Sequence, residues 1–370
     1  MPESVPINRT RLLTARKRRG LTITELAEKM ELDVRTISSY ESGQKSPSPA
    51  ALVRLARVLG FPLEFFEGND IEAIDPAGVS FRSMSRMSAR LRDTALGQGA
   101  LAIEFLDWLE RRFELPEPRL VDLRYDAEAP EGAADSLRRL WGIGELPIRN
   151  MVHLLEANGI RVFSLSIDAR EMDAFSLWRG NTPIVMLNSF KSAEHSRFDS
   201  AHELAHLVLH RHLAPGSKIA EAQADAFASA FLMPRASVLA NCPAFITVDQ
   251  LIQLKAIWGV SVSALNYRLH KIGRTSDWQY KALCIEISKR GYRTCEPNEM
   301  PRESSIVLPK LLASLHKDDG LTRSAIAAAL KLPPGELNDL LFGLTVSAID
   351  GNRKGEPSPF GRKADLRLVK

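Results

Sequence analysis

Hydrophobic residues in the first 60 positions recur at helical spacing in four short segments separated by tight turns. Thr22 and Asp33 stand at the N-cap positions of the second and third segments. Gly20 follows the first segment and Gly60 the last, where glycine commonly ends a helix. Only residues 31–33 separate the second and third segments, which is the spacing of a helix-turn-helix. The pattern predicts an all-α N-terminal domain with helices over 9–19, 22–30, 34–42 and 50–59.

Farther along the chain the hydrophobic period changes twice. Three short runs rich in Val, Ile and Phe, Arg161–Ser166, Ala174–Trp178 and Pro183–Leu187, predict antiparallel strands. Helical spacing precedes these runs and dominates after about Ser192. The segments concerned are 101–113, 133–141, 148–158, 248–258, 261–272, 309–316, 323–330 and 335–342. The expected fold class is therefore mainly α with a small antiparallel β-sheet (α+β), ending in an α-helical C-terminal region.

Length and composition limit the classes of protein to consider. A chain of 370 residues suits two or three domains, and 45% hydrophobic with 25% charged residues is typical of a soluble protein. No stretch approaches the roughly 18 apolar residues of a membrane span, and the N-terminus shows neither a secretory signal nor a lipid anchor. Cys242, Cys284 and Cys295 show no ligand pairing and no disulfide framework. These features predict a cytoplasmic protein without a membrane partner.

Two histidines and a glutamate form the most informative motif, His202-Glu203-Leu204-Ala205-His206, of the HExxH type. The histidines lie four residues apart, so on a helix both face one side and can reach one ion. Neutral imidazole is a good zinc ligand, and the carboxylate of Glu203 can take a proton from water at the open position. The apolar residues that follow indicate a buried helix, in which such a cluster without a metal would be costly.

A catalytic zinc needs a third protein ligand, and the best downstream candidate is Glu221. It lies one helical turn before Asp225, which can accept a hydrogen bond from the non-coordinating nitrogen of a liganding histidine. Three further histidines of this region, His195, His210 and His212, are interpreted as surface or supporting residues without an assigned role.

The stretch RFDSAHELAHLVLH followed by EAQADAFASAFLMP resembles the ImmA/IrrE family of metallopeptidases. The resemblance implies a zincin-like, thermolysin-like zinc site with His202 and His206 as ligands, Glu203 as general base and Glu221 as third ligand. It extends more loosely from Arg161 to Ile272. Within that family the position of Gln223 is often glutamate, so this chain keeps Glu221 alone for the ligand.

The segment 11–66 resembles the lambda-repressor-like (XRE-type) helix-turn-helix domain, in GLTITELAEKM, VRTISSYESGQKSPSP and ALVRLARVLG. Residues 1–60 hold eleven Lys or Arg against six Asp or Glu, a local charge of +5 that suits DNA, whereas the whole chain carries only +4. Where the family often has glutamine, this chain has Ile23, and the alternative is a helix-turn-helix used for protein contact. The residues expected at DNA are Arg35, Thr36, Ser38 and Ser39 for base edges, and Gln44 and Lys45 for phosphates.

These predictions divide the chain into a helix-turn-helix DNA-binding domain (1–67), a linker (68–95), a zinc metallopeptidase-like domain (96–275), a helical C-terminal domain (276–350) and a basic, poorly ordered tail (351–370). The segments opened by Thr322 and by Pro333 allow a second helix-turn-helix or an ordinary helical pair.

Two hypotheses for the function follow. In the first, a zinc-dependent endopeptidase fused to its DNA-binding domain cleaves a repressor-type protein, or itself, and so relieves repression after stress. In the second, a transcription factor or antitoxin uses the zinc-site domain to sense a signal or bind a partner such as a toxin, without turnover. Both predict binding to an operator, commonly as a homodimer. Tyr267, Arg268 and His195 are equal candidates for stabilising the oxyanion of a hydrolytic reaction.

Overall fold

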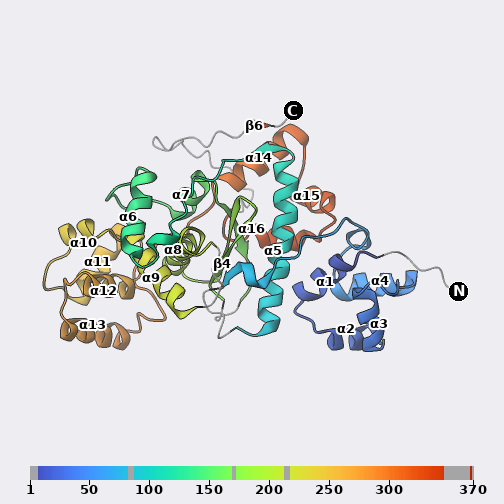
Figure 1. Cartoon of the computed structure of the whole chain (residues 1–370), viewed down its shortest axis with the longest axis horizontal. Helices are drawn as coiled ribbons and strands as arrows, with labels where there is room; N and C mark the ends of the chain where they lie inside the picture. The colour runs from blue at the N-terminus through green and yellow to red at the C-terminus, as the bar shows by residue number, and fades with distance from the viewer. Residues whose placement is uncertain (1–6, 82–86, 169–171, 212–216, 346–366, 369–370) are drawn as a thin grey trace.

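The computed structural model of the chain describes residues 7–81, 87–168, 172–211, 217–345 and 367–368. Helices surround one small sheet, with the N-terminal helices at one end of the molecule (Figure 1). The helices are α1 (Arg9–Arg18), α2 (Ile23–Met30), α3 (Val34–Glu41), α4 (Pro49–Leu59), α5 (Ala89–Glu110), α6 (Pro130–Leu140), α7 (Met151–Ala157), α8 (Ala193–Leu209), α9 (Lys218–Leu232), α10 (Arg235–Asn241), α11 (Val248–Trp258), α12 (Val262–Lys271), α13 (Asp277–Lys289), α14 (Val307–Asp319), α15 (Arg323–Ala329) and α16 (Pro334–Leu341). The strands are β1 (Val79–Phe81), β2 (Phe113–Glu114), β3 (Arg161–Leu165), β4 (Ala174–Arg179), β5 (Thr182–Asn188) and β6 (Arg367–Leu368).

The central sheet corrects the prediction of a purely antiparallel sheet. Its order is β1-β4-β5-β3, and β3 pairs with β5 in parallel, whereas β4 is antiparallel to β5 and to β1. The β4–β5 hairpin turns at Gly180, whose positive φ of 57° suits glycine. Strand β5 is buried from Pro183 to Asn188 because it lies between two neighbours. Such a continuous apolar run marks a central strand but carries no information about its direction.

Helices cover both faces of this sheet. On one face, Ser176 and Trp178 of β4 donate hydrogen bonds to residues of α8. On the other face, a Cβ at Gly99 of α5 would lie 3.1 Å from the ring of Phe175, and Gln98 donates to the carbonyl of Ser164 in β3 at 3.2 Å. Helix α8 is therefore held in the middle of the molecule by the sheet, which fixes the direction of its side chains.

The N-terminal helix-turn-helix packs against the rest of the chain through α1, which contacts α5 and α16. At Gly97 of α5 an added Cβ would lie 3.0 Å from the backbone nitrogen of Arg18, so glycine allows this close approach. Arg18 is buried and pairs with Glu336 at 2.7 Å and with Asp339 at 2.6 Å, both in α16. Arg11 pairs with Glu104 of α5 at 2.8 Å. Arg11 and Arg18 of α1 thus attach this end to the rest of the chain.

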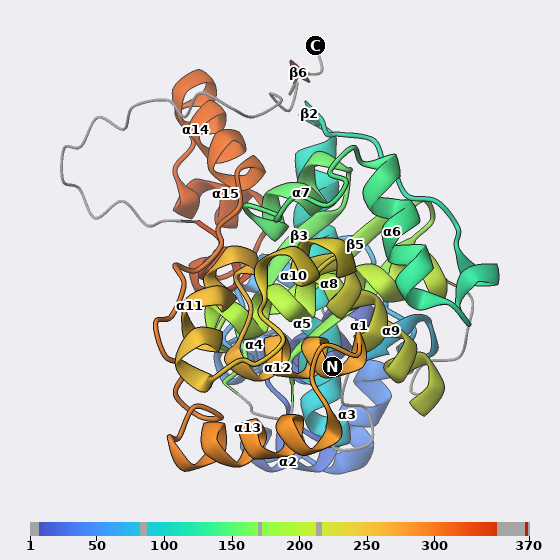
Figure 2. The same ribbon diagram turned by 90° about the vertical axis from the view of Figure 1, so that its left-hand side faces the viewer.

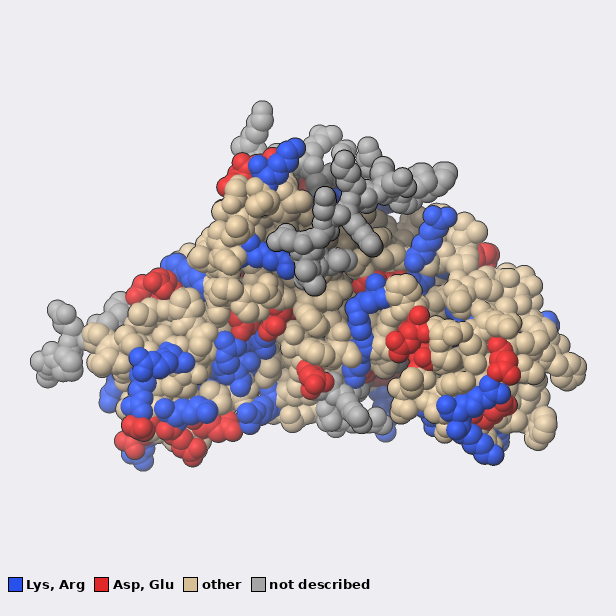
Figure 3. Space-filling model, turned by 180° about the vertical axis from the view of Figure 1, so that it is seen from behind, with Lys and Arg blue, Asp and Glu red and all other residues tan. Residues whose placement is uncertain are grey.

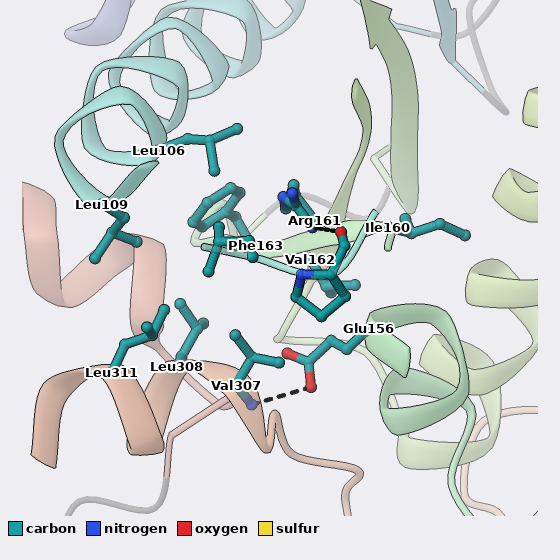
Figure 4. A pocket seen from close by; sticks show the side chains of 12 residues that line it. Leu106, Leu109, Glu156, Ile160, Arg161, Val162, Phe163, Val307, Leu308 and Leu311 are labelled. Carbon is teal, nitrogen blue, oxygen red and sulfur yellow. Dashed lines mark hydrogen bonds between the residues drawn. The ribbon is translucent and has the colours of Figure 1, made fainter. Parts of the chain in front are cut away.

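The C-terminal helices also pack on the sheet side of the molecule. Glu156, at the end of α7, accepts hydrogen bonds from the backbone nitrogens of Ile306 and Val307 at the start of α14 (Figure 4). Apolar residues of α5, β3 and α14 meet beside it and enclose a small hollow, among them Leu106, Leu109, Phe163, Leu308 and Leu311. These contacts place α14 and α16 against the elements that carry the sheet.

Some predicted segments contain unexpected elements. Strand β1 and the first turns of α5 lie within 68–95, the predicted linker. Of the tail 351–370, only β6 is described, paired with β2, so the expectation of poor order concerns residues outside the described part. Among the described helices, none is long and apolar enough to cross a membrane.

Candidate metal centre and DNA interface

Helix α8 presents His202, Glu203 and His206 in the interior. Ser192 caps its first turn by accepting from the backbone nitrogen of His195 at 3.2 Å. The three side chains of the motif are almost completely buried, as are the apolar residues between and after them. The apolar residues pack on the sheet and on α9, which leaves both imidazole rings directed toward the same point.

Glu221, in the first turn of α9, completes a triangle of donor atoms with the two histidines. His202 Nε2 lies 3.1 Å from His206 Nε2 and 3.4 Å from Glu221 Oε2, and His206 Nε2 lies 3.4 Å from Glu221 Oε1. Ligands about 2.0–2.1 Å from a tetrahedral cation are themselves about 3.4 Å apart. Apart from this contact with His206, the buried Oε1 of Glu221 has no hydrogen-bond partner among the described residues. The three residues therefore fit a metal ion as a donor set.

The electrostatics of the triangle favour the protonation states that bind a metal. Burial lowers the pKa of His206 to about 4, so its ring is neutral at neutral pH. Burial raises the pKa of Glu221, but hydrogen bonding with His202 and His206 outweighs it and lowers this pKa to about 2. A neutral imidazole and an ionised carboxylate are the forms that coordinate.

Both ring nitrogens that face away from the triangle have partners. Asp225 Oδ1 lies 2.9 Å from His202 Nδ1, as the spacing of Glu221 and Asp225 predicts. His206 Nδ1 lies 3.0 Å from His210 Nδ1, and His210 Nε2 lies 3.0 Å from Gln223 Oε1. An amide oxygen only accepts hydrogen bonds, so we assign the proton between His210 Nε2 and Gln223 Oε1 to His210 Nε2. His210 Nδ1 is then an acceptor, His206 donates from Nδ1, and His206 Nε2 keeps a lone pair for the metal.

The roles of His210 and Gln223 were not predicted, although the sequence holds a signal for His210. His202, His206 and His210 repeat at intervals of four, which places all three on one helical face. Burial lowers the pKa of His210, which favours the neutral ring that this chain of hydrogen bonds requires. His212 lies outside the described residues.

We expect His210→Ala to weaken metal binding about 10- to 100-fold, the usual effect of losing a group that orients a liganding histidine. Competition with a chromophoric chelator measures this affinity. The matched control is His316→Ala, which removes an exposed histidine of α14. Equal affinities for the two variants and the unaltered chain would show that the His206 ring is oriented by packing alone.

Glu203 is prepared as a proton acceptor beside the triangle. Its Oε2 accepts a hydrogen bond from Ser176 Oγ at 2.7 Å, and its buried Oε1 has no partner among the described residues. Burial raises the pKa of Glu203 to about 8, and the neighbouring carboxylate of Glu221 adds to this effect. Ser176 comes from a distant strand, so nothing in the local sequence could have indicated it. A carboxylate with a raised pKa is suited to accept and return a proton near neutral pH.

The three candidates for oxyanion stabilisation are in different situations. The guanidinium of Arg268 is buried and bound to the carbonyl of Met233 at 2.9 Å and to Glu131 at 2.9 Å, so it is already engaged. His195 Nε2 lies 3.2 Å from Asp173, whose other neighbour is Lys191 at 2.9 Å. Tyr267 is exposed and lines the cavity next to Asp225.

The cluster of Asp173, His195 and Asp199 is a second group of metal-type ligands in the described part of the chain. His195 Nε2 lies 3.4 Å from Asp199, and the ammonium group of Lys191 already faces Asp173. The hydrogen bonds of His195 and Lys191 outweigh burial and lower the pKa of Asp173. We interpret this cluster as an ion-pair network that fixes the start of α8.

Helix α3 lies at the outer end of the helix-turn-helix, away from α5 and the sheet (Figure 1). Ile37 and Tyr40 are buried and hold it against its neighbours. The predicted contact residues Arg35, Ser38, Gln44 and Lys45 are exposed, and Thr36 and Ser39 are partly exposed. Ser39 Oγ donates to the carbonyl of Arg35 at 2.7 Å, so this hydroxyl is engaged within its own helix.

The remaining charges of this end are mixed. Basic and acidic side chains alternate over it in the view from behind (Figure 3). Arg11, Arg16, Arg18 and Arg19 all pair with carboxylates of the chain, and Lys17 lies 3.5 Å from Asp93. The local charge of +5 therefore overstates what DNA would meet. In α16, Glu336, Leu337, Leu340 and Leu341 are buried, which favours the ordinary helical pair over a second helix-turn-helix at the C-terminal end.

Comparisons with known families agree with both parts of this description. Residues 155–270 match a peptidase family model described as the IrrE N-terminal-like domain. Residues 12–66 match a family model described as helix-turn-helix. No curated protein matches the chain.

Proposed function

We propose that this chain, in which an XRE-type helix-turn-helix domain is fused to an ImmA/IrrE domain, is a DNA-binding regulator whose metal centre holds zinc and hydrolyses a peptide bond. The substrate is a repressor-type protein or the chain itself. The observation that carries the proposal is the triangle of His202, His206 and Glu221 with the buried Glu203 beside it. The attached DNA-binding domain favours a regulatory role over a digestive one.

His202, His206 and Glu221 would hold the ion, and Asp225 and His210 would orient the two rings. When bound, zinc supplies Lewis acidity that activates water and polarises the scissile carbonyl. Glu203 accepts the proton of the attacking water and returns it to the leaving amine. Ser176 holds one oxygen of Glu203, which leaves Oε1 for that proton.

For DNA, we propose that α3 enters the major groove, with Arg35 and Ser38 directed to base edges and Lys45 to a phosphate. The exposure of these residues and the packing of α3 away from the sheet support the assignment. Ser39 contributes less, because its hydroxyl already has a partner.

Arg35→Ala and Lys45→Ala are each expected to weaken binding to the chain's own promoter fragment. Loss of one base contact costs about 1–3 kcal/mol, so Arg35→Ala should weaken binding about 10- to 100-fold at that site. Lys45→Ala should weaken binding to all DNA sequences by a similar factor, and it should make the DNA affinity less dependent on salt concentration. Mobility shifts at two salt concentrations measure both effects, with Arg139→Ala on the surface of α6 as control. Binding that survives in both variants would refute the assignment of α3.

One observation supports the second candidate function, a sensor or partner-binding module without turnover. The side chains of His202 and Glu203 have no exposed surface, and among the described residues of the donor triangle, Glu203 and Asp225, only Glu221 and Asp225 have substantially exposed side chains. A polypeptide would have to reach the site from the α9 side. Hydrolysis by a Glu203→Gln variant separates the two functions.

A further inference from the structure

A groove leads away from the metal centre on the α9 side. Its inner part is a cavity of about 710 Å³ between the start of α8 and helices α9, α12 and α13. A second hollow of about 340 Å³ lies on α13. Both are lined by Cys284 and Arg293, so they adjoin. We call the two hollows together the α12–α13 groove. Its walls include Asp225, Tyr267, Tyr280, Cys284, Lys289 and Arg293.

The groove begins at the support of a metal ligand. Asp225 contacts His202 Nδ1 at 2.9 Å and lines the inner cavity. Asp225 and Glu221 are also the members of the centre with exposed side chains. Asp225 is thus the residue at which the groove adjoins the centre.

The groove walls combine aromatic side chains with basic residues at the outer end. Tyr267 and Tyr280 lie in edge contact, with ring centroids 6.5 Å apart, and face the inner cavity. Glu194 and Glu296 also line it, but both contact the buried ammonium of Lys255, at 2.8 and 3.3 Å. One ammonium offsets the charge of only one of these two carboxylates, so the inner cavity suits an uncharged side chain of a ligand better than an acidic one.

Arg293 and Lys289 at the outer end are exposed, and neither forms an ion pair with another described residue. Lys289 is the last residue of α13, and Trp278 and Ile285 of this helix also expose large apolar side chains. Helix α13 lies at the end of the molecule opposite the helix-turn-helix (Figures 1 and 2). Its basic groups are therefore placed to meet a ligand of the metal centre and not the DNA held by α3.

We propose that the α12–α13 groove binds an extended polypeptide segment of the substrate that places an aromatic or large apolar side chain against the two tyrosines and an acidic side chain at Arg293. The inference rests on the proposed function, because it names the substrate class of the same centre. Arg293 acts through its charge on specificity and takes no part in the chemical step.

The test uses the full chain loaded with zinc and pairs of peptide hydroxamates. The two members of a pair share a Tyr-Leu core and differ only in a terminal Asp or Lys, with spacers of one to four residues. The hydroxamate binds zinc and directs the tail along the groove. We expect the Asp member to bind at least 10-fold more tightly at one spacer length, and Arg293→Glu to reverse this preference. Arg139→Glu on α6 is the matched control and should leave it unchanged.

A second measurement does not depend on the metal. The Asp and Lys peptides without the hydroxamate are tested for protection of Cys284 from alkylation, located by mass spectrometry. The Asp peptide should slow alkylation of Cys284 several-fold and leave the exposed Cys295 unaffected.

The outcomes separate the groove from the metal centre. The proposal is overturned if both hydroxamates bind equally tightly to wild type and to Arg293→Glu and the Asp peptide does not selectively protect Cys284. If no hydroxamate binds but the Asp peptide still protects Cys284 selectively, the proposed zinc centre is contradicted and peptide binding in the groove is supported. Protection of Cys284 by a DNA duplex in place of the acidic peptide assigns the surface to nucleic acid and also overturns the proposal.

Discussion

Glu203→Gln is expected to reduce peptide hydrolysis by about 10²- to 10⁴-fold, the contribution usual for a positioned general base. The amide keeps the size of the side chain and can still contact Ser176, but it cannot accept the proton. Zinc content and promoter affinity should stay at wild-type values, because Glu203 belongs neither to the donor triangle nor to α3. Metal analysis, mobility shift and the amount of candidate substrate in cells measure the three properties.

The matched control for Glu203→Gln is Ser176→Ala. It removes the hydrogen bond to Oε2 and leaves the carboxylate in place, so hydrolysis should fall far less than in Glu203→Gln. If cells carrying Glu203→Gln regulate their target as wild type does, the peptidase hypothesis is wrong and the sensor hypothesis gains. A protein that accumulates in Glu203→Gln cells and disappears in wild type would identify the substrate.

Local spacing was sufficient to predict which residues meet in the candidate centre. The four-residue interval of His202 and His206 becomes a shared helix face, and the same interval joins Glu221 to Asp225. These are short-range relations along one helix, which a sequence displays directly. That α9 approaches α8 was not visible from spacing. It was predicted because a catalytic zinc requires a third protein ligand.

Contacts between distant segments were not visible in the sequence. Ser176 reaches Glu203 only because β4 lies on the face of the sheet that carries α8. The parallel pairing of β3 with β5 has no local signal, since an apolar run reads alike in both directions. Strand β1 has only three residues, too few to show an alternation.

The charge count of the N-terminal domain shows a related limit. Arg18 and Arg19 were counted toward a DNA surface, yet both pair with Glu336 more than 300 positions away. Breaking such a buried pair by removing one partner costs about 3–5 kcal/mol in other proteins. The DNA-binding end is thereby tied to α16, which packs on β3 and α5.

Glu221→Ala is expected to lower zinc affinity by more than 100-fold, since loss of a supporting residue alone costs 10- to 100-fold. The variant leaves two imidazoles, too few for a closed donor set, and removes the carboxylate whose depressed pKa reflects its contacts with them. Zinc per chain after dialysis against a mild chelator measures the loss. Asp225→Asn is the matched control, because it keeps all three ligands and weakens only the hold on His202. Zinc content undiminished in Glu221→Ala would remove Glu221 from the ligand set and leave the third ligand to be sought among the other acidic residues near α8.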